Sequence, residues 1–448
     1  MVGGLRENLK MIFIELNEIN FDFVGDYILS GVSLPNLRTL RQQCMSSSSS
    51  EEVYEHLEPW IQWPSVHTGK TYDEHRVFRL GDMVNYHGVQ LFEEIEGRGY
   101  SVGSLSAMNA ANRLEEPAFF IPDPWTDTPA DKSFVSRALA QAVSQTVNDN
   151  TGGKITAQSA FNLMLASATL ISPARYFWFV KKLLWALFKP WRRAIFLDLL
   201  LAEYFVGLVK RKQPEFSTLF LNAGAHIQHH YMLSSSVLTE TAFRNPDWYV
   251  ESSEDPLLEA YQQYDEIIGR LMRLPNARFI IATGLSQKPY EKPVFYYRLA
   301  NHASFLDLLK IAYVSVEPRM TRDFLIRFAD DVARDIAVEK LSALVVNGVA
   351  LFGQLDKRPN EVFVTLDYPF EVTSDTVLEA GAFLGAPLKL AEYVNFVAIK
   401  NGEHQGKGFV FVDPRLDGAE FNDGDHIARL YDTIISQFPN RHSAEAAD

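Results

Sequence analysis

Four short apolar runs stand out along the chain: "KMIFIEL" at 10–16, "YSVGSLSA" at 100–107, "FSTLFLN" at 216–222 and "ARFIIAT" at 277–283. Runs of this length are typical of strands that are buried on both faces of a sheet. Between them lie segments such as "GVQLFEEIEGRGY" and "LLEAYQQYDEIIGRLMRL", in which apolar residues recur at helical spacing. This alternation predicts an α/β protein, a three-layer α/β/α sandwich with a mainly parallel sheet.

The segments that follow the predicted strands are the first place to look for a functional site. In a mainly parallel sheet the ligand lies beyond the carboxyl ends of the strands. Three segments occupy that position: "ELNEIN" after the first strand, "AGAHIQHH" after the run at 216–222, and "TGLSQK" after the run at 277–283. Together they hold most of the polar residues considered below.

One segment, residues 161–212, breaks the alternation because it is helical throughout and rich in aromatic residues. Lys189-Pro190 predicts the turn between two of its helices, since proline cannot continue a helix. Its cations (Lys181, Lys182, Arg192 and Arg193) interrupt the apolar run well short of the ~20 residues that span a bilayer. The segment is interpreted as a helical insertion that caps the sheet. Trp and Phe beside Lys and Arg also favour a helix lying in a membrane interface, so peripheral membrane contact and a partner interface stay open.

The pattern divides the chain into five parts. Residues 1–134 form the first part of the α/β core, 135–213 the aromatic helical insertion, and 214–289 the second part of the core. Residues 290–395 form a smaller subdomain, and 396–448 return to the core.

Composition removes several classes of function. A formal charge of −14 over 448 residues argues against a general nucleic-acid binder, which needs a basic face. Cys44 is the only cysteine, so the chain has no internal disulfide and no cysteine-based zinc cluster. The start of the sequence lacks the apolar run and cleavage site of a secretory signal. A cytoplasmic location is expected, with membrane association left open by residues 161–212.

Five motifs occur in one order between residues 10 and 411. They are "MIFIELNEINFDFV", "WPSVHTGKTYDEH" with Thr68, Gly69 and His75, "HIQHHYM", "DEIIGRLMRLPNARFIIATG" and the Gly-x-His-x-x-x-Gly segment "NGEHQGKGFVF". In this order they resemble the alkaline phosphatase superfamily, in its phosphodiesterase- and phosphohydrolase-like branch. The resemblance implies an alkaline phosphatase-like fold, divalent metal ions and chemistry at phosphate or related esters.

The motifs depart from that family's pattern at several site positions. Asn17 stands where the family places Asp, Glu58 and Pro59 stand at the nucleophile position, and Ala225 and Thr283-Gly284 replace metal ligands. Neither Glu58 nor Pro59 forms a phosphoserine or phosphothreonine intermediate. Only His229 and His404 remain as matched metal ligands.

Two interpretations of these histidines follow. In the first they bind a single divalent ion, with zinc the best suited, and His226 or Glu15 supplies a third ligand. Three protein ligands with an open fourth position are typical of catalytic zinc. His226 is a candidate because it is three residues from His229, and residues three apart share a helical face. In the second interpretation there is no cofactor, and the histidines line a pocket through hydrogen bonds.

The candidate catalytic and binding residues lie close to the same strand ends. Glu15, Glu18 and Glu58 are candidate acids or bases, since burial can raise a carboxyl pKa. Ser65 is a candidate nucleophile with His67 as its base, although residues two apart on a helix do not face each other. Asn17, Gln62, Trp63 and Thr283 are candidate substrate-binding residues.

The function expected from the sequence is hydrolysis or transfer at a phosphate, sulfate or related ester of a small-molecule or lipid-linked substrate. The alternative is a catalytically silent pseudoenzyme that binds a ligand or partner through the same pocket. The candidate acids and histidines favour chemistry, whereas the missing nucleophile and ligand pair favour the silent protein.

Overall fold

A computed structural model describes residues 10–43, 45–148, 156–239, 243–319, 322–379 and 387–442. The chain forms two compact units. The larger comprises Met1–Glu240, Ser252–Pro289 and Gly402–Asp448, and the smaller comprises Thr241–Glu251 and Tyr290–Asn401. The smaller unit therefore combines a short segment before residue 252 with a long one that ends at Asn401.

The larger unit is built on a seven-stranded sheet with the order β2-β17-β6-β1-β5-β3-β4. Its strands are β1 (Lys10–Leu16), β2 (Met45–Ser48), β3 (Val102–Leu105), β4 (Phe119–Ile121), β5 (Phe216–Leu221), β6 (Ala277–Ala282) and β17 (Gly408–Val412). β6, β1, β5, β3 and β4 are parallel, and β17 runs antiparallel to both of its neighbours. The prediction of a mainly parallel α/β sheet is confirmed.

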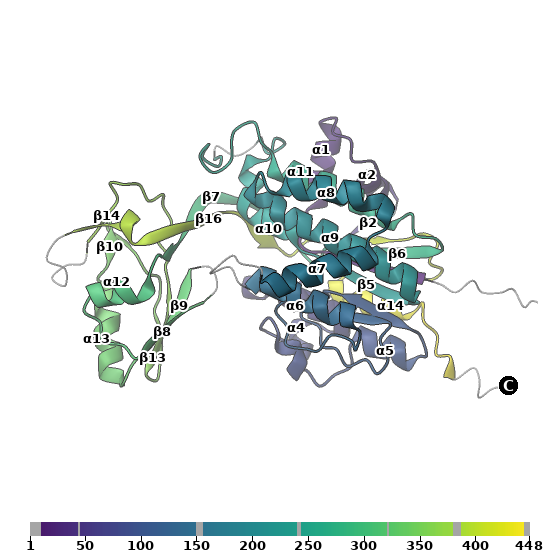
Figure 1. The fold of residues 1–448 in the computed structure, drawn as a ribbon, viewed down its shortest axis with the longest axis horizontal. Helices are drawn as coiled ribbons and strands as arrows, with labels where there is room; N and C mark the ends of the chain where they lie inside the picture. The colour runs from purple at the N-terminus through teal and green to yellow at the C-terminus, as the bar shows by residue number, and fades with distance from the viewer. Residues whose placement is uncertain are drawn as a thin grey trace, which may run out of the picture. The chain divides into compact units, whose positions relative to one another are not determined.

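Helices cover both faces of this sheet, as Figure 1 shows. On one face are α3 (Pro59–Thr68), α4 (Tyr72–His75), α5 (Leu91–Gly97) and α14 (Leu430–Ile435); on the other are α1 (Phe21–Leu29), α2 (Pro35–Gln42), α9 (Pro190–Lys212), α10 (Ala223–Tyr231) and α11 (Pro256–Leu271). The α3 face holds one continuous apolar core, in which Trp63 packs against Phe13 and Phe220 at ring-centroid distances of 6.3 and 5.9 Å. The predicted three-layer arrangement is therefore present.

The predicted helical insertion is made of α6 (Phe134–Asn148), α7 (Ala157–Leu170), α8 (Tyr176–Ala186) and α9. α9 begins at Pro190, so Lys189-Pro190 does mark a helix boundary. α9 is nonetheless a core helix, because its residues from Leu199 to Val209 are buried and it packs on β5, α10 and α11. Within the described residues no single helix has both the length and the apolar composition to cross a membrane. One pair, Ala160–Leu170 with Pro173–Ala186, has them only in combination, and it is bent by 115°.

The smaller unit contains a four-stranded antiparallel sheet with the order β12-β13-β9-β8. Its elements are α12 (His302–Leu308), β8 (Ser315–Pro318), β9 (Asp323–Arg327), α13 (Asp331–Ser342), β10 (Val345–Val346), β11 (Val349–Ala350), β12 (Asp356–Arg358), β13 (Glu361–Thr365), β14 (Val377–Leu378) and β15 (Leu388–Lys389). Phe305, Phe324 and Val364 lie in its own apolar core. The paired strands β7 (Ser286–Leu299) and β16 (Val394–Gln405) each begin in one unit and end in the other.

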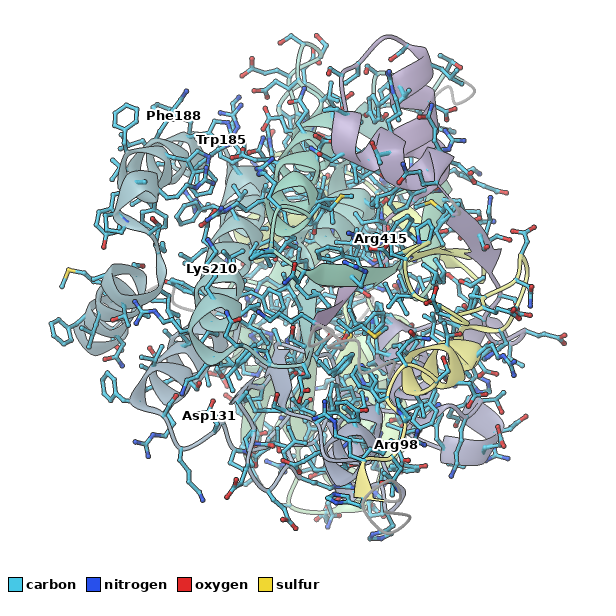
Figure 2. The ribbon with its side chains drawn as sticks, turned by 90° about the vertical axis from the view of Figure 1, so that its right-hand side faces the viewer. Arg98, Asp131, Trp185, Phe188, Lys210 and Arg415 are labelled. Atoms are coloured by element: carbon cyan, nitrogen blue, oxygen red, sulfur yellow. The ribbon has the colours of Figure 1, made fainter. Side chains whose placement is uncertain are left out.

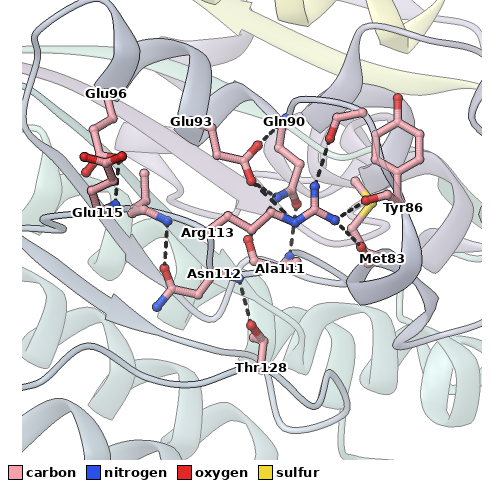
Figure 3. A network of polar contacts seen from close by, with 12 residues as sticks. Met83, Tyr86, Gln90, Glu93, Glu96, Ala111, Asn112, Arg113, Glu115 and Thr128 are labelled. Carbon is pink, nitrogen blue, oxygen red and sulfur yellow. Dashed lines mark hydrogen bonds and ion pairs between the residues drawn. The ribbon is translucent and has the colours of Figure 1, made fainter.

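The loop after β3, which contains Ala111 and Arg113, is held in place by side-chain hydrogen bonds and not by strand pairing (Figure 3). Arg113 donates from Nη1 to the carbonyl of Gly88 at 2.9 Å and from Nη2 to the carbonyl of Met83 at 3.2 Å. Gln90 both donates to and accepts from the backbone of Ala111. These bonds attach the loop to the segments before α5, on the α3 side of the sheet.

Candidate functional site

Three side chains from distant parts of the larger unit meet beyond the carboxyl ends of its central strands. Glu18 follows β1, His229 lies on α10 after β5, and His404 lies on β16 just before β17. Glu18 Oε2 is 3.1 Å from His229 Nε2 and 3.2 Å from His404 Nε2, and the two Nε2 atoms are 3.2 Å apart. The predicted meeting of His229 and His404 is confirmed by this distance. We call these three residues the trio.

Glu18 occupies an unusual backbone position. Its φ angle is +60°, in the left-handed region that side chains other than glycine seldom adopt. The turn is held from both sides, because the Glu18 N–H donates to the carbonyl of Thr283 at 3.0 Å and its carbonyl accepts from Gln228 Nε2 at 2.6 Å. A strained conformation that the surroundings enforce is common at functional sites. Here it aims the carboxylate of Glu18 at the two histidines.

The carboxylate of Glu18 is buried and surrounded by donors. Asn17 Nδ2 donates to Oε1 at 3.1 Å, and Gln287 Nε2 donates to Oε2. Burial by itself raises the pKa of Glu18, but the charges and hydrogen bonds of His404 and His229 together hold the pKa well below its usual value. The group is therefore ionised at neutral pH, which suits a metal ligand or an ion-pair partner and not a general acid.

His229 is positioned by the way α10 starts. The N–H of Ala223 donates to Asp198 Oδ2 of α9 at 2.8 Å, and the N–H of Gly224 donates to Tyr264 Oη of α11 at 2.7 Å. Asp198 also accepts from Tyr264 at 2.7 Å, and burial raises its pKa to about 6. Two helices therefore fix the first turn of α10 and, with it, the direction of His229.

His404 is positioned by a close approach of β16 to α10. A Cβ atom on Gly402 would lie 2.8 Å from the carbonyl oxygen of Gln228, the residue before His229, and 2.2 Å from Gln287 Oε1. A Cβ atom on Gly408 would lie 2.7 Å from the carbonyl oxygen of Gly284. The two glycines of the Gly-x-His-x-x-x-Gly motif are thus the residues that let this strand come near enough for His404 to reach the trio.

Glu58 lies on the other side of the His404 ring. Its Oε2 is 3.5 Å from His404 Nδ1, and its side chain is 30% exposed. A carboxylate beside one ring nitrogen favours a proton there, which leaves the other nitrogen free to act as a ligand. Glu58 also immediately precedes Pro59, the first residue of α3, so the positive end of that helix dipole is adjacent.

The donor set of the trio fits a divalent ion of the zinc type. Ligand atoms about 2.0–2.1 Å from a tetrahedral zinc ion are separated by roughly 3.3 Å. The three distances of 3.1–3.2 Å within the trio match one triangular face of such a tetrahedron. Two imidazoles and one carboxylate are also a donor set that zinc accepts. His229 and His404 are 28% and 13% exposed, so solvent reaches the trio.

Neither of the two residues expected to supply a third ligand belongs to the trio. His226 is exposed and its ring lies 4.8 Å from that of His230, one helical turn away, so the 226/230 pair and not the 226/229 pair shares a face. Glu15 is fully buried under α3, where it accepts from Thr218 Oγ1 at 2.5 Å and lies 3.5 Å from His67 Nε2. The third ligand position is taken by Glu18.

Ser65 and His67 do not form the candidate nucleophile and base. Both are fully buried on α3. Ser65 donates to the carbonyl of Ile61 at 3.2 Å, and its oxygen is 3.1 Å from His75 Nε2. His75 Nδ1 accepts from the N–H of Val77, so in the neutral ring Nε2 carries the proton and donates to Ser65. His75 therefore does not act as a base toward Ser65.

The candidate substrate-binding residues are buried and support the site from beneath. Trp63 Nε1 donates to Asn17 Oδ1 at 2.8 Å, and Asn17 Nδ2 donates to Asn222 Oδ1 at 2.8 Å. Gln62 donates to the carbonyl of His56 at 2.9 Å, and Thr283 Oγ1 accepts from the N–H of Phe409 at 2.9 Å. Their buried positions give them structural hydrogen bonds and no surface for a substrate.

Gln228 and Gln287 are site residues that the sequence interpretation missed. Gln228 Nε2 fixes the backbone of Glu18, and Gln287 Nε2 donates to its carboxylate. Gln287 lies in "TGLSQK", one of the segments singled out by the strand-end rule, but a glutamine has no distinctive chemistry that marks it as a support for a ligand.

Comparison with known proteins gives matches at the level of structure. No family model matches the chain, and no curated protein matches its sequence. Phosphonoacetate hydrolase from Sinorhizobium meliloti 1021 aligns over 96% of both chains with a TM-score of 0.44 at 11% identity. Murine ectonucleotide pyrophosphatase/phosphodiesterase 5 aligns over 96% of this chain and 95% of its own, at 0.39 and 9%. Alkaline phosphatase from the Antarctic bacterium TAB5 aligns over 96% and 98%, at 0.38 and 8%. Each of these three structures therefore aligns with almost the whole chain, at low sequence identity.

Proposed function

We propose that this protein is a hydrolase or transferase that acts on a phosphate, sulfate or related ester through a single divalent ion of the zinc type. The observation that carries the proposal is the trio, in which Glu18, His229 and His404 present three ligand atoms 3.1–3.2 Å apart. The resemblance in motif order supports the ester class. The adjacent start of α3 also favours an anionic substrate group.

Each residue of the site has a role in this proposal. Glu18, His229 and His404 hold the ion, and Asn17 and Gln287 orient the carboxylate of Glu18. When bound, a zinc-type ion supplies Lewis-acid polarisation of an ester oxygen and lowers the pKa of a coordinated water. Glu58 keeps the proton of His404 on Nδ1, and its partly exposed carboxylate can accept a proton from water that approaches the site.

A single ion and direct attack by water are favoured over the two-ion, phosphoenzyme route. Ala225 and Thr283-Gly284 occupy the positions at which the family has further metal ligands. The hydroxyl oxygen of Thr283 already accepts a hydrogen bond from the N–H of Phe409. The nucleophile position holds Glu58 and Pro59, and Ser65 is buried. A phosphoserine or phosphothreonine intermediate is therefore not favoured at this position or at Ser65.

Metal analysis and an ester panel test the proposal. Protein purified without added metal and then equilibrated with zinc should hold one ion per chain, and Glu18→Gln and His404→Gln should each lose it. His230→Gln is the matched control, because His230 lies on the same helix as His229 but outside the trio. Zinc-loaded protein should hydrolyse at least one of an aryl phosphate, a bis-aryl phosphodiester or an aryl sulfate, and Glu18→Gln should not.

The missing second-ion ligands and nucleophile favour one alternative, a pseudoenzyme that keeps the pocket for binding. The metal analysis and the ester panel together distinguish an active enzyme from this pseudoenzyme. Normal zinc content with no turnover of any ester supports the pseudoenzyme. Absence of zinc from wild-type protein after equilibration would show that the trio is a hydrogen-bonded group, and it would remove the metal-dependent proposal.

A further inference from the structure

One face of α8 (Tyr176–Ala186) is attached to the protein through the cations Arg175 and Lys182. Arg175, just before the helix, pairs with Glu203 of α9 at 2.9 Å, and Lys182 pairs with Glu266 of α11 at 2.9 Å. Trp178, on the same face, lies 3.6 Å under the guanidinium carbon of Arg175. Ion pairs and stacked indoles thus attach this face of α8 to α9 and α11.

The opposite face of α8 carries large apolar side chains that point away from the protein. Phe177 is 85% exposed, and Leu187 and Phe188, at the end of the helix, are 62% and 75% exposed. Val180 and Leu184 are also exposed and lie on the same face by helical spacing. In Figure 2, the helix that carries Trp185 and Phe188 lies at the upper left of the view, with Phe188 on its outer side. A surface helix of a soluble domain normally has the reverse arrangement.

α7 extends this apolar face. Phe161, Met164 and Leu165 of α7 are 52%, 61% and 38% exposed. α7 and α8 follow each other in the chain, and their axes are bent by 115°. Large exposed apolar residues gathered on two successive helices mark an interaction site, whereas single exposed apolar residues need no explanation. We call the exposed apolar residues of α7 and α8, through Phe188, the apolar face.

The charge of this region is opposite to that of the whole chain. The chain has a formal charge of −14, yet residues 157–197 contain no Asp or Glu and contain six cations: Arg175, Lys181, Lys182, Lys189, Arg192 and Arg193. Lys182, Lys189 and Arg192 pair with Glu266, Glu254 and Glu259. Lys181 and Arg193 are exposed. An apolar surface whose own segment has no acidic residue, and which is bordered by two exposed cations, matches the interface of an anionic bilayer.

We propose that the apolar face is a membrane-docking surface, on which α7 and α8 lie in the plane of an anionic lipid bilayer. Each helix is shorter than the ~20 residues needed to span the hydrocarbon core, so they lie on the bilayer and do not cross it. A second copy of the chain is a poorer occupant, because a symmetric contact would bring the exposed Lys181 and Arg193 of both copies together. The surface is independent of the trio and of the function proposed for it.

Vesicle flotation with the full-length protein tests the docking surface. Wild type should be recovered with vesicles of phosphatidylcholine and phosphatidylserine, and less with phosphatidylcholine alone. Phe177→Ser/Phe188→Ser should lower partitioning at least about tenfold, since each phenyl ring contributes a large apolar area. The matched control is Leu29→Ser/Val89→Ser, which removes two exposed apolar side chains outside the apolar face and should partition like wild type.

A charge variant and a measurement of oligomeric state complete the test. Lys181→Gln/Arg193→Gln should reduce the preference for phosphatidylserine and leave the binding to phosphatidylcholine unchanged. All variants alter exposed side chains, and thermal melting verifies that they fold. The proposal is overturned if wild type does not float, or if wild type and Phe177→Ser/Phe188→Ser are recovered equally. It is also overturned if light scattering shows a wild-type dimer that this variant loses, because a second copy would then cover the face.

Discussion

Replacing Gly402 with alanine tests whether the approach of β16 to α10 creates the metal site. The added Cβ would lie 2.8 Å from the carbonyl oxygen of Gln228, so β16 has to retreat by about 0.6 Å to reach the shortest ordinary contact of 3.4 Å. It would also lie 2.2 Å from Gln287 Oε1. Gln287 does not turn away freely, because its Nε2 donates to the carboxylate of Glu18.

The size of this shift predicts the size of the effect. His404 is two residues from Gly402 on the same strand, and a bound metal tolerates ligand distances only within about 0.2 Å of their preferred values. A retreat of about 0.6 Å therefore exceeds what the site accepts. Since disturbing the supports of metal ligands typically costs 10–100-fold in affinity, we expect zinc affinity to fall at least about tenfold. Overpacking should also destabilise the fold by about 1–3 kcal/mol.

The assay is competition for zinc between the protein and a chromogenic chelator, with thermal melting to verify folding. Gly406→Ala is the matched control, because a Cβ there would have its nearest neighbour, Leu57 Cδ2, at an ordinary 3.5 Å. It should bind zinc like wild type. If folded Gly402→Ala binds zinc as tightly as Gly406→Ala, then the close approach of β16 does not set the geometry of the trio.

Three further predictions concern the same unit. Ser65→Ala should keep full ester hydrolysis, because the hydroxyl of Ser65 is buried and donates a hydrogen bond to the carbonyl of Ile61. Loss of turnover with intact zinc binding would show that Ser65 takes part in catalysis. Burial lowers the pKa of His75 to about 4. Between pH 6.5 and 4 this histidine is therefore protonated in the unfolded chain but not in the folded protein. The free energy of unfolding should fall by up to about 3 kcal/mol over this range as the pH drops. Urea unfolding of His75→Gln should show a smaller fall, and an equal fall would contradict the assignment. A chelator should lower the melting temperature of zinc-loaded wild type but not that of Glu18→Gln. The reason is that an ion present at 100 times its Kd stabilises the folded protein by about 2.7 kcal/mol. Equal shifts in the two proteins would show that the ion binds elsewhere.

The location of the site could be predicted from the sequence because it follows from topology. Parallel strands bring their carboxyl ends to one edge of a sheet, so the segments after β1, β5 and β6 had to meet. His229 follows β5 directly, and His404 is marked by glycines whose lack of a side chain permits the approach. Both of these signals are local in the sequence, which is why the pairing of these two histidines could be expected.

The identity of the third ligand could not be predicted, because it depends on one backbone angle. Glu15 lies within β1 and its side chain faces α3, so the alternation of a strand directs it away from the histidines. Glu18 lies after the end of β1, where a φ of +60° reverses the chain and turns its carboxylate toward α10. That angle is enforced by Gln228 and by the backbone of Thr283, more than 200 residues away in the sequence. No local propensity encodes such a turn at a glutamate.

The insertion was hard to interpret from sequence for a related reason. Between residues 157 and 197 its composition is apolar and cationic with no acidic residue, so the pattern alone leaves open which face of each helix is buried. The structure resolves this through Glu259 and Glu266 of α11, which draw Arg192 and Lys182 inward and leave Phe177 exposed. Removing Lys182 or Arg192 would therefore disturb packing as well as charge, and a loss of lipid binding in such variants would be ambiguous. Lys181 is the more informative cation to replace, because it is exposed whereas Lys182 is half-buried against Glu266.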